Sequence, residues 1–334
     1  MSFLKKLAAA TTVVAALAAV SVAPAMAQNM KIALVVKNLG NGFFDAANKG
    51  AQEAAAELGG VEVIYTGPTQ ATPEGQIDII NQLVSQKVNA IAISANDADA
   101  LVPALQAAMK AGITVISFDS GVSAEGRQMN LLASATQLIG DQNLQMASDL
   151  LGSEKGDVAV LSATSTATNQ NSWIEVMKAD VGKYPNLNLT AVVYGDDKQD
   201  KSYTEAKGLI DSNPNLRVII APTTVGIAAA AQYVEDNGLV GKVLVTGLGL
   251  PSEMINHVKS GAAPQFALWN PIDLGYAAVT IAYNIATGKE TPTAGGELSM
   301  GRLGKVKLDD DLSGPMAPPF VFDASNIDEF SKVY

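Results

Sequence analysis

The chain has no cysteine and a single histidine, His257, among its 334 residues. Without cysteine no disulfide framework exists, so a buried hydrophobic core has to stabilise the fold. One histidine excludes most histidine-based metal sites and most Ser-His-Asp triads, and we expect no bound metal and no cofactor. His257 lies in a short predicted helix away from the strand ends, and we interpret it as a surface or packing residue.

Catalytic and nucleotide-binding motifs are missing as well. The P-loop motif, HExxH and GxSxG do not occur, and the pair Gly247 and Gly249 lacks the third glycine of a dinucleotide-binding loop. The acidic run at residues 309–311 lacks the alternating oxygen ligands of a calcium loop. The formal charge of −11 repels phosphates and anionic lipids. We therefore expect a neutral or zwitterionic small ligand, and neither nucleic acid nor a membrane surface as a partner.

Long apolar runs are absent except near the first residue. There Lys5 and Lys6 precede an apolar run over residues 7–22 and a small-residue cleavage site at residues 25–27. This pattern predicts a secretory signal peptide over residues 1–27, whereas the alternative, an uncleaved anchor helix, calls for a longer run. Cleavage would remove two lysines and take the formal charge from −11 to −13. Since no cysteine is present to carry a lipid, we expect a free, soluble protein in a periplasm.

The hydrophobic residues, 48% of the chain, follow an alternating pattern of strands and helices. The continuous apolar run at residues 32–36 predicts a parallel strand buried on both faces, and apolar residues three and four apart over residues 44–58 predict a helix. Predicted strands start near residues 31, 61, 90 and 113, and the pattern resumes at residue 158. Because this is the spacing of βαβ units, the sequence predicts an α/β fold with two doubly wound, Rossmann-like parallel-sheet domains.

In open parallel sheets, ligands bind outside the carboxyl ends of the strands, so the strand-end loops hold the candidate residues. In the first half these are Lys37, Asn41, Phe43, Phe44 and Asp119. Aromatic faces pack on the C–H faces of a sugar ring, while amide, ammonium and carboxylate groups bond to its hydroxyls. The alternatives are that Phe43 and Phe44 belong to the core and that Asp119 stabilises a turn or caps a helix.

The second half offers a mostly neutral set of strand-end residues. The candidates are Asn169, Gln170, Trp173, Pro222, Thr224, Leu248 and Asn270. Each of these residues alone is weak evidence for a site. Their joint placement at four strand ends favours a hydrogen-bonding wall that faces the first half across a cleft.

Several segments together resemble the periplasmic sugar-binding proteins of ABC importers, in the ribose-binding-like class, and within it rhamnose-binding proteins. The resembling segments include VVKNLGNGFFDAANKGAQEAA, VISFDSG, TNQNSW, APTTVGIAAAAQ, VTGLGLPSEM and ALWNPIDLGYAA. The resemblance implies a type I periplasmic binding protein with three crossovers, near residues 131–134, 270–273 and 291–297. It implies an N-terminal lobe of residues 28–132 plus 272–292 and a C-terminal lobe of residues 133–271 plus 293–334.

The related autoinducer-2 receptors give a test at the level of single residues. Lys37 and Asp119 match ligand-binding positions of that family, whereas Asn169 and Asn270 replace its aspartates and Thr224 replaces its alanine. In the ribose-binding class an aspartate is expected where this chain has Leu248. Fewer carboxylates and an apolar Leu248 favour a 6-deoxyhexose, and the resemblance therefore implies L-rhamnose as the ligand.

We expect a non-enzymatic, monomeric receptor that captures this monosaccharide and delivers it to an ABC permease, with a chemoreceptor as a possible further partner. One alternative is a receptor for autoinducer-2 or another sugar or polyol. A secreted α/β enzyme would need a paired acid and base, and only Asp119 is a good candidate. A sugar-responsive transcription regulator would need a DNA-binding headpiece in place of the predicted signal peptide.

Overall fold

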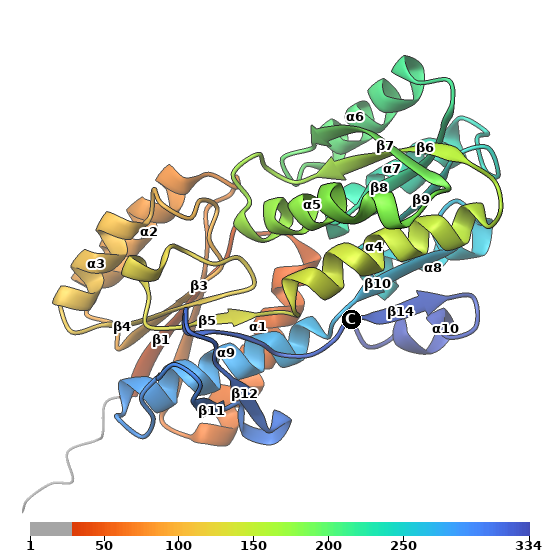
Figure 1. Cartoon of the computed structure of the whole chain (residues 1–334). Helices are drawn as coiled ribbons and strands as arrows, with labels where there is room; N and C mark the ends of the chain where they lie inside the picture. Colours follow the sequence, from red (N-terminus) through yellow and green to blue (C-terminus); the bar gives the residue numbers. More distant parts are fainter. Residues whose placement is uncertain (1–28) are drawn as a thin grey trace, which may run out of the picture.

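The computed structural model of the chain describes residues 29–334, and the predicted signal peptide, residues 1–27, lies outside the described residues. Two α/β lobes lie one above the other in Figure 1 and are connected by several passages of the chain. The predicted fold class is confirmed, because each lobe has a parallel sheet with helices on both faces. None of the helices within residues 29–334 has both the length and the apolar character that a bilayer span requires.

The sheet of the first lobe has six parallel strands in the order β13-β5-β4-β3-β1-β2. Their bounds are β1 Met30–Val35, β2 Val61–Thr66, β3 Ala90–Ile93, β4 Thr114–Phe118, β5 Asn130–Leu132 and β13 Ser313–Pro315. Helices α1 (Gly42–Leu58) and α9 (Pro271–Ala286) pack on one face, against side chains such as Ile32. Helices α2 (Pro73–Ser85) and α3 (Val102–Lys110) pack on the other face, against side chains such as Val35.

The sheet of the second lobe has four parallel strands in the order β7-β6-β8-β9. Their bounds are β6 Gly156–Ser162, β7 Leu187–Tyr194, β8 Leu216–Ala221 and β9 Leu244–Gly247. Helices α4 (Thr136–Leu151) and α5 (Thr168–Asp180) cover one face, and α6 (Gln199–Ser212) and α7 (Thr224–Asp236) cover the other. Strand β10 (Gln265–Leu268) follows α8 (Pro251–Ser260), pairs with β14 (Phe320–Asp323) and contacts β9 through a bridge between Leu248 and Ala267.

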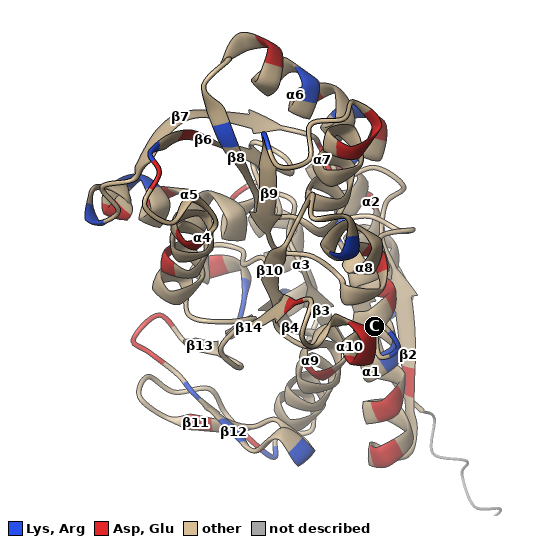
Figure 2. Cartoon of the chain, turned by 90° about the vertical axis from the view of Figure 1, so that its right-hand side faces the viewer, with Lys and Arg blue, Asp and Glu red and all other residues tan. Residues whose placement is uncertain are grey.

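The remaining elements are short. They are the hairpin of β11 (Glu297–Ser299) and β12 (Lys305–Lys307), the helix α10 (Ile327–Phe330), and the 3-10 turns Ala124–Gly126, Val181–Lys183 and Gly301–Leu303. Charged positions of both signs are spread over the outer elements, including α6 and the end of α1 far from the pocket described below (Figure 2).

Two glycines let α1 and α9 approach each other closely. A Cβ atom on Gly50 would lie 1.7 Å from the carbonyl oxygen of Ile272, and one on Gly275 would lie 1.8 Å from that of Ala47. Both distances are far below any van der Waals contact, so these two positions require glycine. Helix α9, which leaves the second lobe after β10, is thereby packed tightly onto the first lobe.

The division of the tail differs from the prediction, which assigned all of residues 293–334 to the second lobe and placed the third crossover near 291–297. Strand β13 instead pairs with β5 in the first sheet, and β14 pairs with β10, so the chain returns to the second lobe after Pro315. The three-residue strand β13 has no hydrophobic alternation that would reveal it. The long-range ion pair between Arg127 and Asp311 (2.5 Å) helps to hold this segment beside β5.

Candidate ligand-binding site

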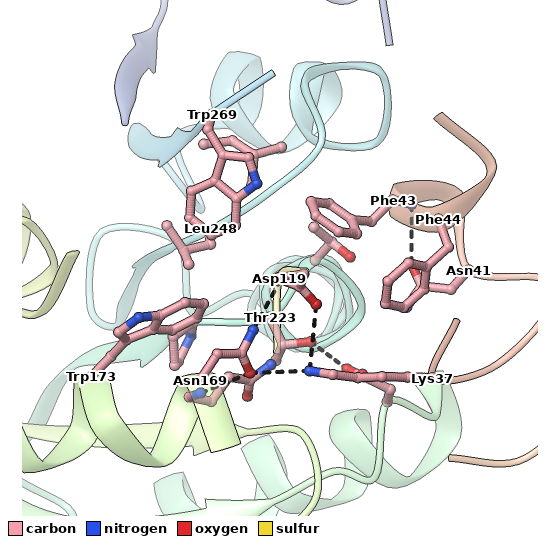
Figure 3. A pocket seen from close by; sticks show the side chains of 15 residues that line it. Lys37, Asn41, Phe43, Phe44, Asp119, Asn169, Trp173, Thr223, Leu248 and Trp269 are labelled. Carbon is pink, nitrogen blue, oxygen red and sulfur yellow. Dashed lines mark hydrogen bonds and ion pairs between the residues drawn. The ribbon is translucent and has the colours of Figure 1, made fainter. Parts of the chain in front are cut away.

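A pocket lies between the lobes (Figure 3), and most of its lining residues follow the carboxyl ends of strands in both sheets. It encloses about 370 Å³ of space free of atoms, part of which is open to solvent. Its lining from the first lobe is Lys37, Asn41, Phe43, Phe44 and Asp119. Its lining from the second lobe and its connections is Asn169, Gln170, Trp173, Asp197, Pro222, Thr223, Thr224, Leu248, Leu268 and Trp269.

The polar end of the pocket is organised by three side chains that join the lobes (Figure 3). Lys37 Nζ donates to Asn169 Oδ1 (3.0 Å), and Asn169 Nδ2 donates to Asp119 Oδ1 (3.0 Å). Lys37 Nζ also lies 3.8 Å from Asp119 Oδ2, and both residues are only 4% exposed. A buried cation and anion are thus paired directly and through one amide, which compensates the cost of removing both charges from water.

Asp119 occupies a backbone conformation that L-residues rarely adopt. It directly follows β4 with φ +59°, in the left-handed region that aspartate tolerates better than most residues. Its Oδ2 also accepts a 2.6 Å hydrogen bond from the Ser94 hydroxyl. The strand end and Ser94 therefore fix the carboxylate at the pocket, and backbone strain of this kind is common at functional sites.

Gln170 and Asn41 have side-chain orientations that their partners determine. Gln170 Oε1 accepts from the Ser162 hydroxyl (2.6 Å) and from the Ala163 backbone N–H (2.8 Å). Asn41 Oδ1 accepts from the Phe43 backbone N–H (3.0 Å) and so caps α1. Because the oxygens face these donors, the amide nitrogens Gln170 Nε2 and Asn41 Nδ2 remain as donors, and within residues 29–334 neither has a hydrogen-bond partner.

Aromatic side chains form the opposite, apolar end of the pocket. The Phe43 ring meets Phe44 and Trp269 edge to face, with centroids 5.2 and 6.1 Å apart, and Trp173 meets Trp269 at 5.8 Å. Leu248, 2% exposed, also lines this region (Figure 3). The Trp269 indole nitrogen is buried, and within residues 29–334 it has no hydrogen-bond acceptor. A buried donor without an acceptor is costly, so this atom is a candidate for a ligand oxygen.

Asp197 lines the pocket without having been predicted. It lies on the loop between β7 and α6, it is partly buried, and its Oδ1 accepts a hydrogen bond from the Thr223 hydroxyl. Burial raises the pKa of the Asp197 carboxyl, and the Lys37 ammonium across the cleft opposes that rise. Asp197 also lines an outer cavity that shares Asn41 with the pocket, so both residues lie at the boundary between the two spaces.

Direct contacts between the lobes surround the pocket. The Thr166 hydroxyl donates to the Asn96 carbonyl oxygen (2.7 Å), and the Asn169 backbone N–H donates to the Ser120 hydroxyl (3.4 Å). Gly42 at the start of α1 lies against the second lobe, since a Cβ there would be 2.8 Å from Glu253 Oε1. The lobes are therefore in a closed arrangement.

Eleven of the twelve predicted site residues line this one pocket, and their role in binding stays a prediction. Asn270 does not line it. Its Oδ1 accepts from the Ile272 backbone N–H (3.0 Å), and its Nδ2 donates to Asp273 (2.8 Å), so it caps α9. The lining residues that sequence reasoning missed are Asp197, Thr223, Leu268 and Trp269. Of these, Trp269 could have been predicted to line the site, because it is the last residue of the apolar run 266–269, which predicts a strand.

His257 and the acidic residues take no part in a metal site of the described chain. His257 Nδ1 lies 2.9 Å from Glu235 Oε1 between α7 and α8, away from the pocket lining. Residues 29–334 contain no group of three or more His, Asp or Glu side chains placed to hold a metal ion.

Comparisons with known proteins agree with this geometry. Residues 32–290 match the sequence profile of the family described as periplasmic binding protein domain. The crystal structure of an ABC transporter solute-binding protein from Clostridium phytofermentas with bound L-rhamnose is 40% identical, with a TM-score of 0.87 over 92% of this chain and 99% of that chain. LsrB from Clostridium saccharobutylicum in complex with AI-2 is 26% identical, with a TM-score of 0.84 over 90% of this chain and 99% of that chain.

A curated relative agrees at the level of sequence. The D-allose-binding periplasmic protein of Escherichia coli (strain K12) is 26% identical over 254 residues, which are 73% of this chain and 80% of the relative. The similarity therefore extends over most of both chains.

Proposed function

Because the chain belongs to the periplasmic binding protein family, we propose that it captures a monosaccharide, L-rhamnose, between its two lobes and delivers it to a membrane permease. The family consists of substrate-binding proteins of ABC transporters, which are not enzymes and act in the periplasm. The protein would act as a monomer, with a chemoreceptor as a second candidate partner. The observation that carries the proposal is the two-sided character of the pocket.

The polar end suits the hydroxyls of a neutral sugar. Lys37 and the amide nitrogens of Asn41 and Gln170 supply donors, and the Asp119 carboxylate accepts. A sugar hydroxyl both donates and accepts, so it needs this mixture of partners, and bonds to charged groups are the stronger ones.

The apolar end suits a sugar with a methyl group in place of one hydroxymethyl. Leu248, Trp173 and Trp269 offer contacts to C–H groups and only one donor, the Trp269 indole nitrogen. An added hydroxyl on the ligand would lose its water partners there without full replacement. L-Rhamnose has such a methyl group, and the 40% identical protein from Clostridium phytofermentas was crystallised with this sugar.

Closure couples binding to transport in this proposal. The sugar contacts both lobes only when they are closed, so it shifts the equilibrium between open and closed forms. A shift from mostly open to mostly closed needs a differential affinity of about 5 kcal/mol, which a few charge-assisted hydrogen bonds and aromatic contacts can supply. The closed pair of lobes would then present one continuous surface to the permease.

Calorimetric titration tests the ligand. L-Rhamnose should bind more tightly than L-mannose, its counterpart with a hydroxyl on C6, and more tightly than D-ribose or D-allose. Small-angle scattering should show compaction when L-rhamnose is added. Equal affinity for L-rhamnose and L-mannose would contradict the assignment of the methyl group, and unchanged dimensions at saturation would contradict closure.

A second candidate, autoinducer-2, is favoured by one observation. Lys37 and Asp119 match ligand-binding positions expected in the autoinducer-2 receptors, and here they lie 3.8 Å apart in the pocket. Against this ligand, Asn169 stands where those receptors carry an aspartate, so the site has one charge fewer. Titration with autoinducer-2 beside L-rhamnose separates the two candidates, since only one of them should bind tightly.

A further inference from the structure

We propose that Asp197 is a sugar-binding residue, the carboxylate by which the second lobe accepts hydrogen bonds from ligand hydroxyls. The inference deepens the proposed function and rests on it. The residues predicted from sequence for the second lobe's side of the pocket include no carboxylate. In the structure Asp197 supplies one, from a different loop, between β7 and α6.

The backbone around Asp197 is the first line of support. Asp196 and Asp197 have φ values of +56° and +50°, two successive left-handed residues that are not glycine. Such a residue carries backbone strain and persists only where the surrounding structure or function requires it. Asp119, the carboxylate at the pocket in the first lobe, has the same unusual conformation with φ +59°. Each lobe thus presents one strained aspartate to the same cavity.

The partners of Asp197 are the second line of support. The Thr223 hydroxyl donates to Asp197 Oδ1, and Thr223 is only 5% exposed, so one oxygen is held in place from the start of α7. The other oxygen, Oδ2, has neither a hydrogen bond nor an ion pair within residues 29–334. In Asp119, by contrast, both oxygens already accept hydrogen bonds from protein side chains. Asp197 therefore retains more capacity to accept from a ligand.

The balance of donors and acceptors is the third line of support. The groups that the second lobe leaves without partners among the described residues include Gln170 Nε2 and Trp269 Nε1, which can only donate. A sugar hydroxyl that accepts from one of these still has a proton to place. Among the second-lobe side chains that line the pocket, Asp197 is the one carboxylate, which in its ionised form accepts without donating. With it, each lobe offers both an anionic acceptor and neutral or cationic donors.

The test compares two neighbouring aspartates with the same backbone conformation. Asparagine tolerates the left-handed region as well as aspartate does, so neither Asp197→Asn nor Asp196→Asn should disturb the loop. Asp196 pairs with Lys201 (2.7 Å) and does not line the pocket, which makes it the matched control. Calorimetric titration with L-rhamnose should show affinity about 10- to 100-fold weaker for Asp197→Asn and within about 2-fold of wild type for Asp196→Asn.

A ligand series distinguishes contact from indirect damage. Monodeoxy analogues of L-rhamnose should include one whose missing hydroxyl weakens binding to the wild type but makes no difference to Asp197→Asn, because the two changes remove the same bond. A further variant, Thr223→Val, keeps the carboxylate but frees it, and should weaken binding less than Asp197→Asn does.

The outcomes separate the two proposals. If the wild type binds L-rhamnose and Asp197→Asn binds it equally well, the assignment of Asp197 is overturned while the proposed function stands. The assignment is also overturned if Asp197→Asn weakens binding to every analogue by the same factor, since the effect would then be structural. If the wild type binds no monosaccharide, the proposed function fails and the role of Asp197 fails with it.

Discussion

The two lobes differ in whether their polar groups at the pocket already have hydrogen-bond partners. In the first lobe the charged groups are already engaged, because Asp119 accepts from Ser94 and Asn169, and Lys37 donates to Asn169. In the second lobe Gln170 Nε2, Asp197 Oδ2 and Trp269 Nε1 lack partners among the described residues. The comparison indicates that the charged groups of the first lobe are bonded once the lobes close, largely through Asn169, whereas the second lobe keeps groups that the ligand completes.

The strongest challenge to this comparison is removal of the Asp119 carboxylate. In Asp119→Ala the buried Lys37 ammonium loses its counter-ion, and breaking such a pair costs about 3–5 kcal/mol of unfolding free energy. Affinity for L-rhamnose should fall at least about 100-fold, since a charged acceptor is lost as well. Denaturant unfolding and calorimetric titration measure the two effects.

Two further variants control that experiment. Asp119→Asn keeps the shape and the left-handed backbone, so it should bind poorly while folding better than Asp119→Ala. Asp310→Ala, at an exposed position of the tail, should leave both affinity and unfolding unchanged. Retention of tight binding in Asp119→Asn would show that the first lobe does not act through this charge.

The substitution Leu248→Asp tests the predicted contact between the apolar end of the pocket and the methyl group of the ligand. A carboxylate beside Trp269 would be poorly solvated against the ligand methyl group, so affinity for L-rhamnose should fall about 10- to 100-fold. Affinity for L-mannose should fall less, because its C6 hydroxyl can donate to the new carboxylate. Calorimetric titration of both sugars gives the ratio, and equal losses would refute the methyl contact.

The substitution Asn169→Asp tests the hydrogen bonds by which Asn169 joins the two lobes. The new carboxylate would lie near Asp119 Oδ1, where Asn169 Nδ2 now donates over 3.0 Å, and two carboxylates this close cannot both ionise easily. Affinity at neutral pH should fall about 10-fold and recover as the pH falls, because one added proton restores a donor between the two groups.

The decisive measurement is the affinity of this variant for L-rhamnose at pH values from about 8 to 5, because the proton that the two carboxyl groups share has a raised pKa. Asn256→Asp makes the same chemical change at an exposed position of α8 and should bind like the wild type at every pH. A variant at Asn169 that is equally weak at every pH would argue against a charge conflict with Asp119.

The smallest effect on affinity is expected for Asn270→Ala. Loss of the cap on α9 should lower the unfolding free energy by about 1 kcal/mol, as is usual for such residues. Affinity for L-rhamnose should change by less than about 2-fold, because Asn270 does not line the pocket. A loss of affinity larger than the loss of stability would instead place Asn270 among the ligand contacts.

Much of the first lobe's site is predictable from sequence for a physical reason. The end of a continuous apolar strand, such as residues 32–36, can be located from the sequence. The residue after it, Lys37, must therefore lie at the carboxyl edge of a parallel sheet. Asp119 follows β4 in the same way. At these two residues the end of an apolar run in the sequence coincides with the carboxyl edge of the sheet, so the sequence locates both of them in the pocket.

The rest of the site depends on contacts that leave no local pattern. Asp197 lies in a charged loop where nothing in the sequence separates it from Asp196, and only its backbone and Thr223 turn it to the cavity. The position of Asn270 at a predicted strand end indicates a site residue, although asparagine before Pro271 is also the signature of a helix start. The pairing of β13 was hidden because a three-residue strand rests on partners far away in sequence.

The two tryptophans give this protein an intrinsic optical reporter. The chain has only Trp173 and Trp269, and both line the pocket with centroids 5.8 Å apart. All indole fluorescence therefore originates at the place where the lobes meet, with no background from elsewhere in the molecule. Any change that separates the lobes or fills the cavity should alter the emission, so opening and filling can be followed in real time without a label.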